Sequence, residues 1–219
     1  MADRVISILT PATSFGLLTL EEAKLALGMS ITDASEDQQL SFWNEMNSQT
    51  VMRMCNRIFA REEVREEWRE LNGGWRIFPS HWPIKQADLI SVESPMGTAL
   101  DPSNYELEEQ SGKIEFFGGM NGSGSSAWVE PVVVHYWGGY VLPDNAPMPL
   151  KRATSMLNVQ SKMLGTLGTV GGLRSLSHKE SRIMYHDPSR ILAMALGGPA
   201  GGIDRAIWSI LSHFVRYEV

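Results

Sequence analysis

Hydrophobic and polar positions change their spacing twice along the chain. Apolar residues first recur at helical spacing, then from Arg61 occur in the short runs and alternations typical of β-strands, and from Leu150 return to helical spacing. The pattern therefore predicts an α+β fold in which an antiparallel β-domain is inserted into a helical bundle. We place the β-domain at residues 61–144 and the discontinuous helical domain at residues 1–60 and 145–219.

The first helical stretch predicts two amphipathic helices. Thr19 followed by Glu22 forms a capping box, in which each side chain accepts a backbone N–H from the other residue, so a helix over Leu20–Leu27 begins there. A longer helix is predicted over Glu36–Ile58, with its apolar side chains mostly on one face: Leu40, Trp43, Met46, Val51, Met54 and Ile58. Neither helix is stable alone, so each must pack against another. The single cysteine, Cys55, is expected in this core and excludes an intrachain disulfide.

The middle stretch predicts about six short strands, which favours an antiparallel sheet or a small barrel. The clearest strand is Pro131–Tyr140, because its three consecutive valines and its aromatic residues suit a buried, pleated surface. Gly138 and Gly139 end this strand with a turn where a Cβ atom would clash. The other expected strands are Val64–Trp68, Trp75–Phe78, Ala87–Glu93, Tyr105–Glu108 and Lys113–Phe117.

The C-terminal part begins with a helix over Leu150–Leu164 and continues into a segment rich in glycine. Eight glycines lie between Gly165 and Gly202, which predicts a flexible segment that ends in an amphipathic helix over Ile203–Arg216. This last helix either docks on a partner or packs on the first helices of its own chain. We treat residues 165–219 as the candidate docking segment, with these candidate contact residues: Ile203, Arg205, Ile207, Leu211, Phe214, Arg216 and Tyr217.

Charge is distributed unevenly along the chain. The net charge is −6, but residues 148–219 carry nine basic and four acidic side chains, a net of +5 against −11 for the rest. The overall negative charge argues against a general nucleic-acid binder. The asymmetry fits contacts between copies or with an acidic partner, and it also fits solvated faces that differ without functional meaning. No apolar run reaches the length that crosses a membrane.

Candidate chemistry is sparse, so we expect no enzyme, no metal and no cofactor. The histidines have no metal-ligand spacing: His81, His135, His178, His186 and His213. Gly122–Ala127 matches a dinucleotide-binding pattern by letter, but a strand and not a helix follows it. The paired glutamates Glu62–Glu63 and Glu66–Glu67 lack the spacing of a calcium loop, so we expect a solvated acidic face.

The order of these features resembles the head–tail connector (adaptor) proteins of tailed bacteriophages and gene transfer agents. The resemblance runs from about Leu18 to Leu164 and more weakly to Arg216. It depends on an ordered series of common motifs: Leu18–Lys24, Met54–Arg57, Trp82-Pro83-Ile84, Ile90-Ser91-Val92, Leu100–Leu107, Ser111–Ile114, Val132–Tyr140 and Pro149–Ala153. The polar loop 118–126 and the glycines between Gly165 and Gly202 depart from the pattern expected for the family.

The resemblance implies a structural protein of the virion neck, made in the cytoplasm of the host bacterium. It implies a cyclic homo-oligomer, with twelve copies beneath the portal protein and with a downstream neck or tail protein on the other side. The C-terminal segment would reach the portal. DNA would pass through the ring without sequence-specific binding, and an acidic ring suits this because it repels phosphate.

Two alternatives stay open at this point. One is a head-completion or tail-terminator protein of the same neck. The other is a carbohydrate-binding or enzymatic module that uses the aromatic residues of the β-domain: Trp68, Trp75, Trp82, Trp128 and Trp137. Core packing explains the tryptophans equally well.

Overall fold

The computed structural model confirms the α+β class and divides the chain into two compact units. The β unit comprises Met1–Phe15 and Arg57–Asn145, and the helical unit comprises Gly16–Asn56 and Ala146–Val219. The chain therefore passes from one unit to the other three times. The structure describes these residues: 4–71, 74–117, 128–170, 175–178, 181–184 and 202–215.

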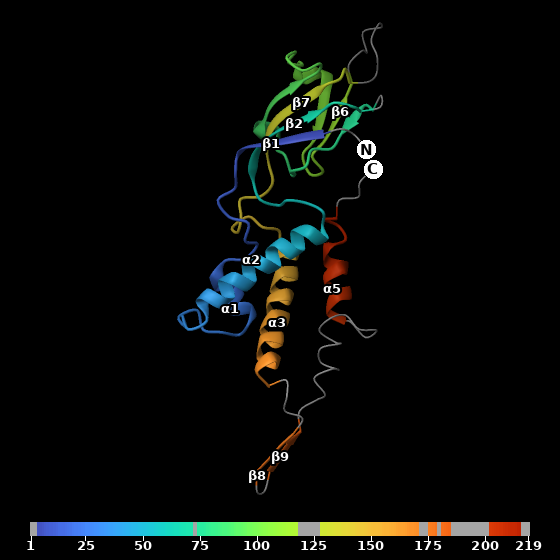
Figure 1. The fold of residues 1–219 in the computed structure, drawn as a ribbon. Helices are drawn as coiled ribbons and strands as arrows, with labels where there is room; N and C mark the ends of the chain where they lie inside the picture. The colour runs from blue at the N-terminus through green and yellow to red at the C-terminus, as the bar shows by residue number, and fades with distance from the viewer. Residues whose placement is uncertain are drawn as a thin grey trace. The chain divides into compact units, whose positions relative to one another are not determined.

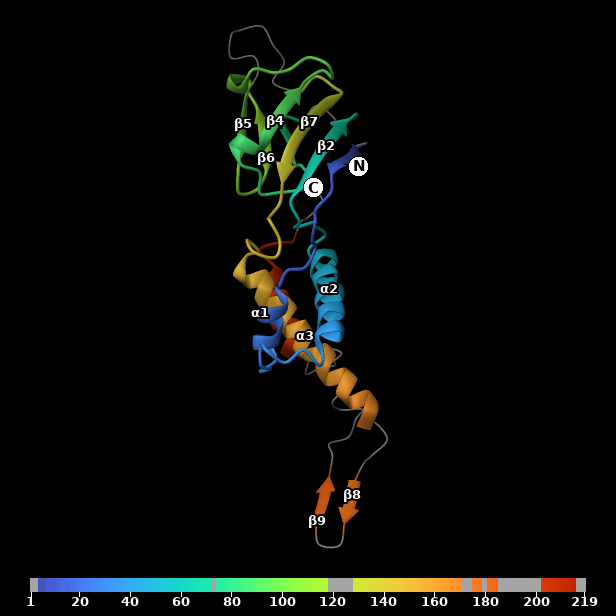
Figure 2. The same cartoon turned by 90° about the vertical axis from the view of Figure 1, so that its left-hand side faces the viewer.

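The larger sheet of the β unit has four antiparallel strands in the order β1–β2–β7–β4 (Figure 2). Their bounds are β1 (Arg4–Thr10), β2 (Glu62–Trp68), β7 (Val132–Gly138) and β4 (Leu89–Glu93). The valine-rich strand β7 is an interior strand, with Val134 opposite Glu66 of β2 and Val92 of β4. Its interior position explains its nearly continuous apolar sequence, because such a strand is packed on both faces.

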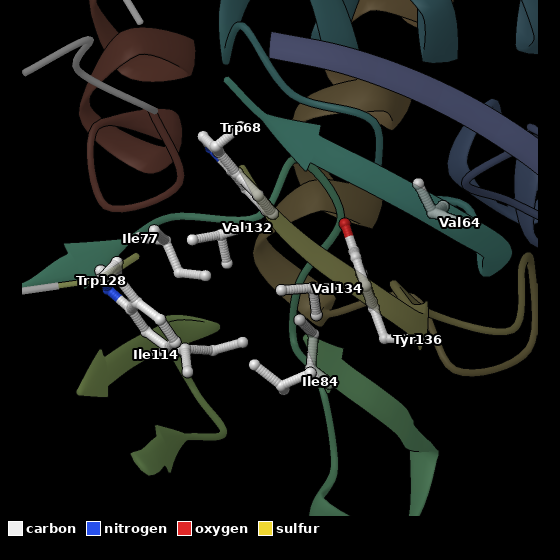
Figure 3. Close-up of a cluster of buried hydrophobic side chains, with 10 residues drawn as sticks. Val64, Trp68, Ile77, Ile84, Ile114, Trp128, Val132, Val134 and Tyr136 are labelled. Carbon is white, nitrogen blue, oxygen red and sulfur yellow. The ribbon is translucent and has the colours of Figure 1, made fainter. Parts of the chain in front are cut away.

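A second sheet completes the core of the β unit. Its strands have the order β3–β6–β5, with bounds β3 (Arg76–Ile77), β6 (Lys113–Phe116) and β5 (Tyr105–Glu108). Short 3₁₀ helices, η1 (Gln86–Asp88) and η2 (Pro102–Asn104), precede β4 and β5. Figure 3 shows this core of buried side chains, to which both sheets and the segments between the strands contribute. Its members are Val64, Trp68, Ile77, Ile84, Val92, Ile114, Trp128, Val132, Val134 and Tyr136.

The end of β7 confirms the predicted need for glycine. A Cβ atom on Gly138 would overlap the backbone of His81, and one on Gly139 would overlap the backbone of Ala60. Gly139 also has a φ of +100°, which side-chain-bearing residues rarely adopt. The two glycines therefore allow the chain segments around β7 to approach closely.

Strand β1 is absent from the sequence prediction. The sequence interpretation places Arg4–Thr10 in the helical domain with the rest of residues 1–60, whereas the structure pairs it with β2, Arg4 opposite Trp68 and Ile8 opposite Val64. Valine and isoleucine suit a strand. The usual alternation of polar and apolar residues does not reveal β1, because both of its faces carry apolar side chains.

The helical unit contains α1 (Leu20–Ala26), α2 (Asp37–Met54), α3 (Met148–Val170) and α5 (Gly202–Leu211). Figure 1 shows α1, α2 and α5 beside α3, which each of them contacts. The predicted capping box of α1 is confirmed: the Glu22 N–H donates to Thr19 Oγ1 at 3.1 Å, and the Thr19 N–H donates to Glu22 Oε2 at 2.9 Å.

Three helices end several residues away from their predicted ends. Helix α5 ends at Leu211 and not at Arg216. Helix α2 ends at Met54 and not at Ile58, because Asn56 has a φ of +49° that interrupts the helix. Cys55 caps α2 and is buried, as expected. Helix α3 continues past Leu164 to Val170, and at Gly165 a Cβ atom would lie 3.4 Å from the ring of Trp43.

A β-hairpin lies within the stretch that the sequence predicts to be flexible. It pairs β8 (Ser175–His178) with β9 (Ser181–Met184) in antiparallel register. The predicted short helix that begins at Asp187-Pro188 lies outside the described residues.

Candidate assembly surfaces

Helix α5 carries most of the predicted docking residues, and part of its apolar stripe is buried within the chain. Ile207 is 1% exposed and Leu211 is fully buried, and α5 packs against α3. These two residues therefore fit the alternative in which the last helix packs on its own chain, although its partner is α3 and not the first helices. Another protein can contact them only if α5 leaves α3.

The accessible surface of α5 is formed by other side chains. Arg205 is exposed, Phe214 is half-buried, and Trp208 is 49% exposed. Trp208 is not among the contact residues predicted from the sequence, because it lies off the apolar stripe. Large aromatic side chains and arginine are enriched at protein interfaces, so Arg205 and Trp208 form the candidate contact surface of α5. The side chain of Ile203 and the whole of Arg216 and Tyr217 lie outside the described residues.

Buried asparagines join α2 to α3 inside the helical unit. We call Asn44, Asn47 and Asn158 the asparagine cluster. Asn47 Nδ2 donates to Asn158 Oδ1 at 2.8 Å and to Ser161 Oγ at 3.0 Å, and Asn158 Nδ2 lies 3.4 Å from Asn44 Oδ1. Asn44 also donates to the Leu18 carbonyl at 2.8 Å. Because each bond needs particular partners, the cluster fixes the register of the two helices.

Ion pairs tie the surface of the helical unit together. Lys151 Nζ lies 2.6 Å from Glu22 Oε1 and joins α3 to α1, and Lys162 Nζ lies 2.8 Å from Glu36 Oε2. Burial raises the pKa of Glu22, but the bonds from Lys151 and Thr19 outweigh it, so the net pKa is lowered. Glu22 therefore caps α1 and pairs with α3 as a carboxylate.

Two of the four paired glutamates are buried, which corrects the expectation of a solvated acidic face. Glu62 is 4% exposed and Glu66 is 0% exposed, because alternate residues of β2 face the core. We call Glu62, Glu66, His81 and Tyr136 the acidic cluster. His81 Nε2 lies 2.9 Å from Glu62 Oε2, and the Tyr136 hydroxyl donates to Glu66. The cluster could not be predicted from the repeated glutamates, because charged residues usually lie on the surface of a protein.

The acidic cluster is closed to solvent. His81 is 1% exposed and Tyr136 is fully buried. Burial and the charge of Glu66 raise the pKa of Tyr136 well above its usual value, so the phenol stays protonated and continues to donate. Ser80 also donates its backbone N–H to Glu66 at 2.7 Å. The cluster therefore acts as a buried polar support of β2 and β7, in which Glu66 Oε2 makes no hydrogen bond but lies 3.6 Å from Arg4 Nη1. Among the residues that the structure describes, no group of three or more histidine, cysteine, aspartate or glutamate side chains could hold a metal ion.

The tryptophans of the β unit mostly belong to its core. Trp68 and Trp128 are 3% and 5% exposed, and Trp128 stacks on Phe116 with ring centroids 4.9 Å apart. The guanidinium of Arg57 lies 3.0 Å from the ring centroid of Trp82. Two tryptophans lie outside this core: Trp75 is 43% exposed, and Trp137 is half-buried with the Arg61 guanidinium 5.6 Å from its ring centroid. This arrangement weakens the carbohydrate-binding alternative, which needs aromatic rings on the surface.

The free edge of the larger sheet is apolar. In the described part of the chain, β1 pairs with β2 on one side and with no strand on the other. Its apolar side chains are exposed by 36% to 49%: Val5, Ile6, Ile8 and Leu9. The other edge strand, β4, is partly covered by its own chain, because the Leu100 N–H donates to the Val92 carbonyl at 2.8 Å. Unpaired apolar edges are places where other chains add.

Two further sequence expectations bear on these surfaces. Among the helices that the structure describes, none is long and apolar enough to cross a membrane. The Gly122–Ala127 segment, rejected as a dinucleotide-binding motif, lies outside the described residues.

Comparison with known proteins relates the fold to solved structures. No protein-family profile and no curated protein sequence matches the chain. A chain in the structure titled "Neck of empty GTA particle computed with C6 symmetry" is similar over 98% of this chain and 97% of its own length, with a TM-score of 0.56 and 13% identity. Chains in "Virion of native gene transfer agent (GTA) particle" and "Neck of native GTA particle computed with C12 symmetry" give TM-scores of 0.55 and 0.53 at the same identity and coverage. The chain therefore shares its fold with proteins of gene transfer agent particles.

Proposed function

We propose that this protein is a structural component of the neck of a tailed phage or a related particle, where copies form a ring between head and tail. The observation that carries the proposal is the fold likeness to neck chains over 98% of this chain and 97% of theirs, at a TM-score of 0.56. A match over both full lengths includes the β unit, the helical unit and their order along the chain. A single common domain shared by chance gives no such match.

The ring and its symmetry form the next part of the proposal. Two of the similar structures are necks computed with sixfold and twelvefold symmetry. These symmetries support a homo-oligomeric ring of twelve copies, with the portal protein on one side and a neck or tail protein on the other. The acidic β unit suits such a ring, because it carries eight basic and fifteen acidic side chains, a net of −7. DNA would pass without being held, since like charges repel.

Helix α5 supplies the proposed contact with the portal. Arg205 and Trp208 are exposed on a helix whose other side is anchored to α3 by Ile207 and Leu211. A rigidly held helix with an exposed tryptophan loses little freedom on binding, which favours affinity. The other sequence-based candidates stay part of this proposal: Ile203 on α5, and Phe214, Arg216 and Tyr217, which follow α5 in the sequence. The buried pair Ile207 and Leu211 serves as the anchor.

Cryo-electron microscopy of the particle tests the location. We expect particles isolated from cells that express a tagged chain to show it as a ring beneath the portal. Its absence from the particle, or its presence in the capsid shell, would contradict the proposal. A ring at the far end of the neck would favour the tail-terminator alternative.

Portal binding tests the role of α5. We expect Trp208→Ser to reduce binding to the purified portal ring in native mass spectrometry, while circular dichroism stays unchanged. Trp75→Ser is the matched control, because Trp75 is exposed to a similar extent, 43% against 49%, on the β unit. Equal binding by both variants would place the portal contact outside α5.

A further inference from the structure

The longest run without a charged residue includes all of β1 except Arg4. Residues 5–20 contain no aspartate, glutamate, lysine, arginine or histidine, although 20% of the chain is charged. Residues 17 and 18 of this run are buried, but most of residues 5–15 are exposed. From Val5 onward this exposed edge strand therefore lacks the charged side chains with which monomeric proteins protect such edges. The composition of β1 therefore fits a strand that is covered by another chain.

Polar contacts hold β1 firmly against its own sheet. Arg4 Nη1 lies 3.6 Å from Glu66 Oε2, and the Thr10 hydroxyl donates to Glu63 Oε2 at 2.5 Å. The Ala12 N–H donates to Glu62 Oε1 at 3.1 Å. The hydrogen bonds from Thr10, which has the larger effect, and from His135 lower the pKa of Glu63. Glu63 therefore stays ionised and continues to accept the bond from Thr10. β1 is thus a fixed strand that presents a preorganised edge.

The apolar residues of β1 lie on both faces of the strand. Ile6 and Ile8 stand opposite Glu66 and Val64, on the face that looks toward the core, and Val5 lies on the other face. The exposed fractions are 41% for Ile6 and 42% for Ile8, because the core does not extend beyond β2 at this edge. A neighbour that adds beside β1 would bury these side chains together with the free backbone edge.

The distribution of charge favours another copy of this chain as the neighbour. Two β units of net charge −7 repel each other, and the repulsion is least where they meet through a surface without charges. A basic partner would bind more tightly to the acidic surface of the β unit than to an uncharged edge. A ring also requires each copy to contact two neighbours through two different surfaces. The edge of β1 is suited to be one of them.

We infer that the edge of β1 (Arg4–Thr10) is a contact between neighbouring copies, in which the β unit of one copy adds beside β1 of the next. This inference rests on the proposed ring. It assigns the contact between copies to the β unit and leaves α5 free for a different protein.

Self-association of the full-length chain tests the inference. We compare wild type with the double variant Ile6→Lys/Ile8→Lys and with Leu9→Lys, using native mass spectrometry and light scattering after size exclusion. The concentration at half-dissociation should rise about 100-fold for the double variant, because two apolar side chains leave the contact and two like charges enter it. Leu9→Lys should show a smaller rise. It also serves as the second variant, since Leu9 is 49% exposed and tolerates lysine even if the double variant unfolds.

Ile90→Lys is the matched control. Ile90 is a 51% exposed isoleucine of β4, at the opposite edge of the same sheet. It should associate as wild type does, and circular dichroism should show the same fold for every variant that is compared. Loss of association in Ile90→Lys equal to that in the β1 variants would overturn the inference.

Other outcomes separate the inference from the proposed function. A wild-type chain that stays monomeric at its highest soluble concentration overturns the inference, as do β1 variants that associate normally. β1 variants that associate normally but are lost from particles would assign the edge to a different protein and also overturn it. If wild type is found in the particle neck in these cases, the proposed function stands. If wild type associates through β1 but is absent from the neck, the proposed function fails and the inference stands.

Discussion

The two units of this protein have cores of different kinds. The core of the β unit is a continuous apolar cluster between two sheets, and its polar groups lie together in the acidic cluster. In the helical unit, apolar side chains such as Val51, Leu150 and Leu211 are also buried, and the contact between α2 and α3 includes the asparagine cluster. Apolar packing gives stability without direction, whereas paired amides give one register. Both units are therefore stabilised by apolar packing, and the buried amides add a defined helix register to the helical unit.

Removal of a core tryptophan should produce the largest effect. Trp68→Ala should lower the free energy of unfolding by about 3–5 kcal/mol, because a large buried ring is replaced by a cavity. Urea denaturation followed by circular dichroism measures the loss. Trp75→Ala is the control and should cost less than about 1 kcal/mol, since Trp75 is exposed and contacts mainly the Arg76 guanidinium, 3.8 Å from its ring. Equal losses would show that the apolar core does not dominate the β unit.

Removal of one asparagine should have an intermediate effect on the helical unit. Asn158→Ala should lower the free energy of unfolding by about 1–3 kcal/mol, because the buried amides of Asn44 and Asn47 lose their hydrogen bonds with Asn158. Gln39→Ala removes an exposed amide from α2 and should be nearly neutral. In a double-mutant cycle, the double variant Asn47→Ala/Asn158→Ala should lose less free energy of unfolding than the sum of the losses of the two single variants. Strict additivity would contradict a coupled cluster.

The acidic cluster should make the β unit sensitive to alkaline pH. The folded-state pKa of Tyr136 is raised above the usual 10.0, so its stabilising effect is complete below pH 10 and is lost as the pH rises toward the folded-state value. Stability should fall by up to about 1.4 kcal/mol for each pH unit above 10, since the unfolded chain releases the proton first. In urea denaturation at several pH values, Tyr136→Phe should reduce the fall of the free energy of unfolding with pH. Tyr105, whose pKa is also raised by burial, should account for part of any remaining slope.

Removal of a surface ion pair should have the smallest effect. Lys162→Ala breaks the pair with Glu36, whose side chain is 41% exposed, and should cost less than about 1 kcal/mol. The loss should diminish further in high salt, because salt screens exposed charges. A large loss that persists in high salt would mean that Lys162 stabilises the helical unit through packing and not through its charge.

Elements with strong local signals could be predicted from the sequence. The capping box of Thr19 and Glu22, the strand Tyr105–Glu108 and the glycine turn after β7 all occur as expected. Each of these depends on neighbouring residues, so periodicity and residue type are sufficient to identify it. The α+β class follows from the same signals.

Elements that depend on distant partners could not be predicted. β1 forms a strand because it pairs with β2, which lies more than fifty residues later in the chain. Glu62 and Glu66 are buried because His81, Ser80 and Tyr136 satisfy them, which no local pattern reveals. In the docking segment, Ile207 and Leu211 lie against α3 and the exposed Trp208 lies off the stripe, because tertiary packing decides which side of an amphipathic helix stays accessible.

The early position of β1 in the chain has a consequence for folding during synthesis. The ribosome makes β1 before Gly16–Asn56 of the helical unit and before β2, and β2 in turn pairs with β7, which ends at Gly138. The β unit can therefore close only after the first half of the helical unit has emerged. Until then the nascent chain carries an unpaired strand with no charged residue after Arg4. Two chains growing on the same messenger RNA could exchange this strand by domain swapping. The edge that suits assembly would then also be the part of the chain where misfolding begins.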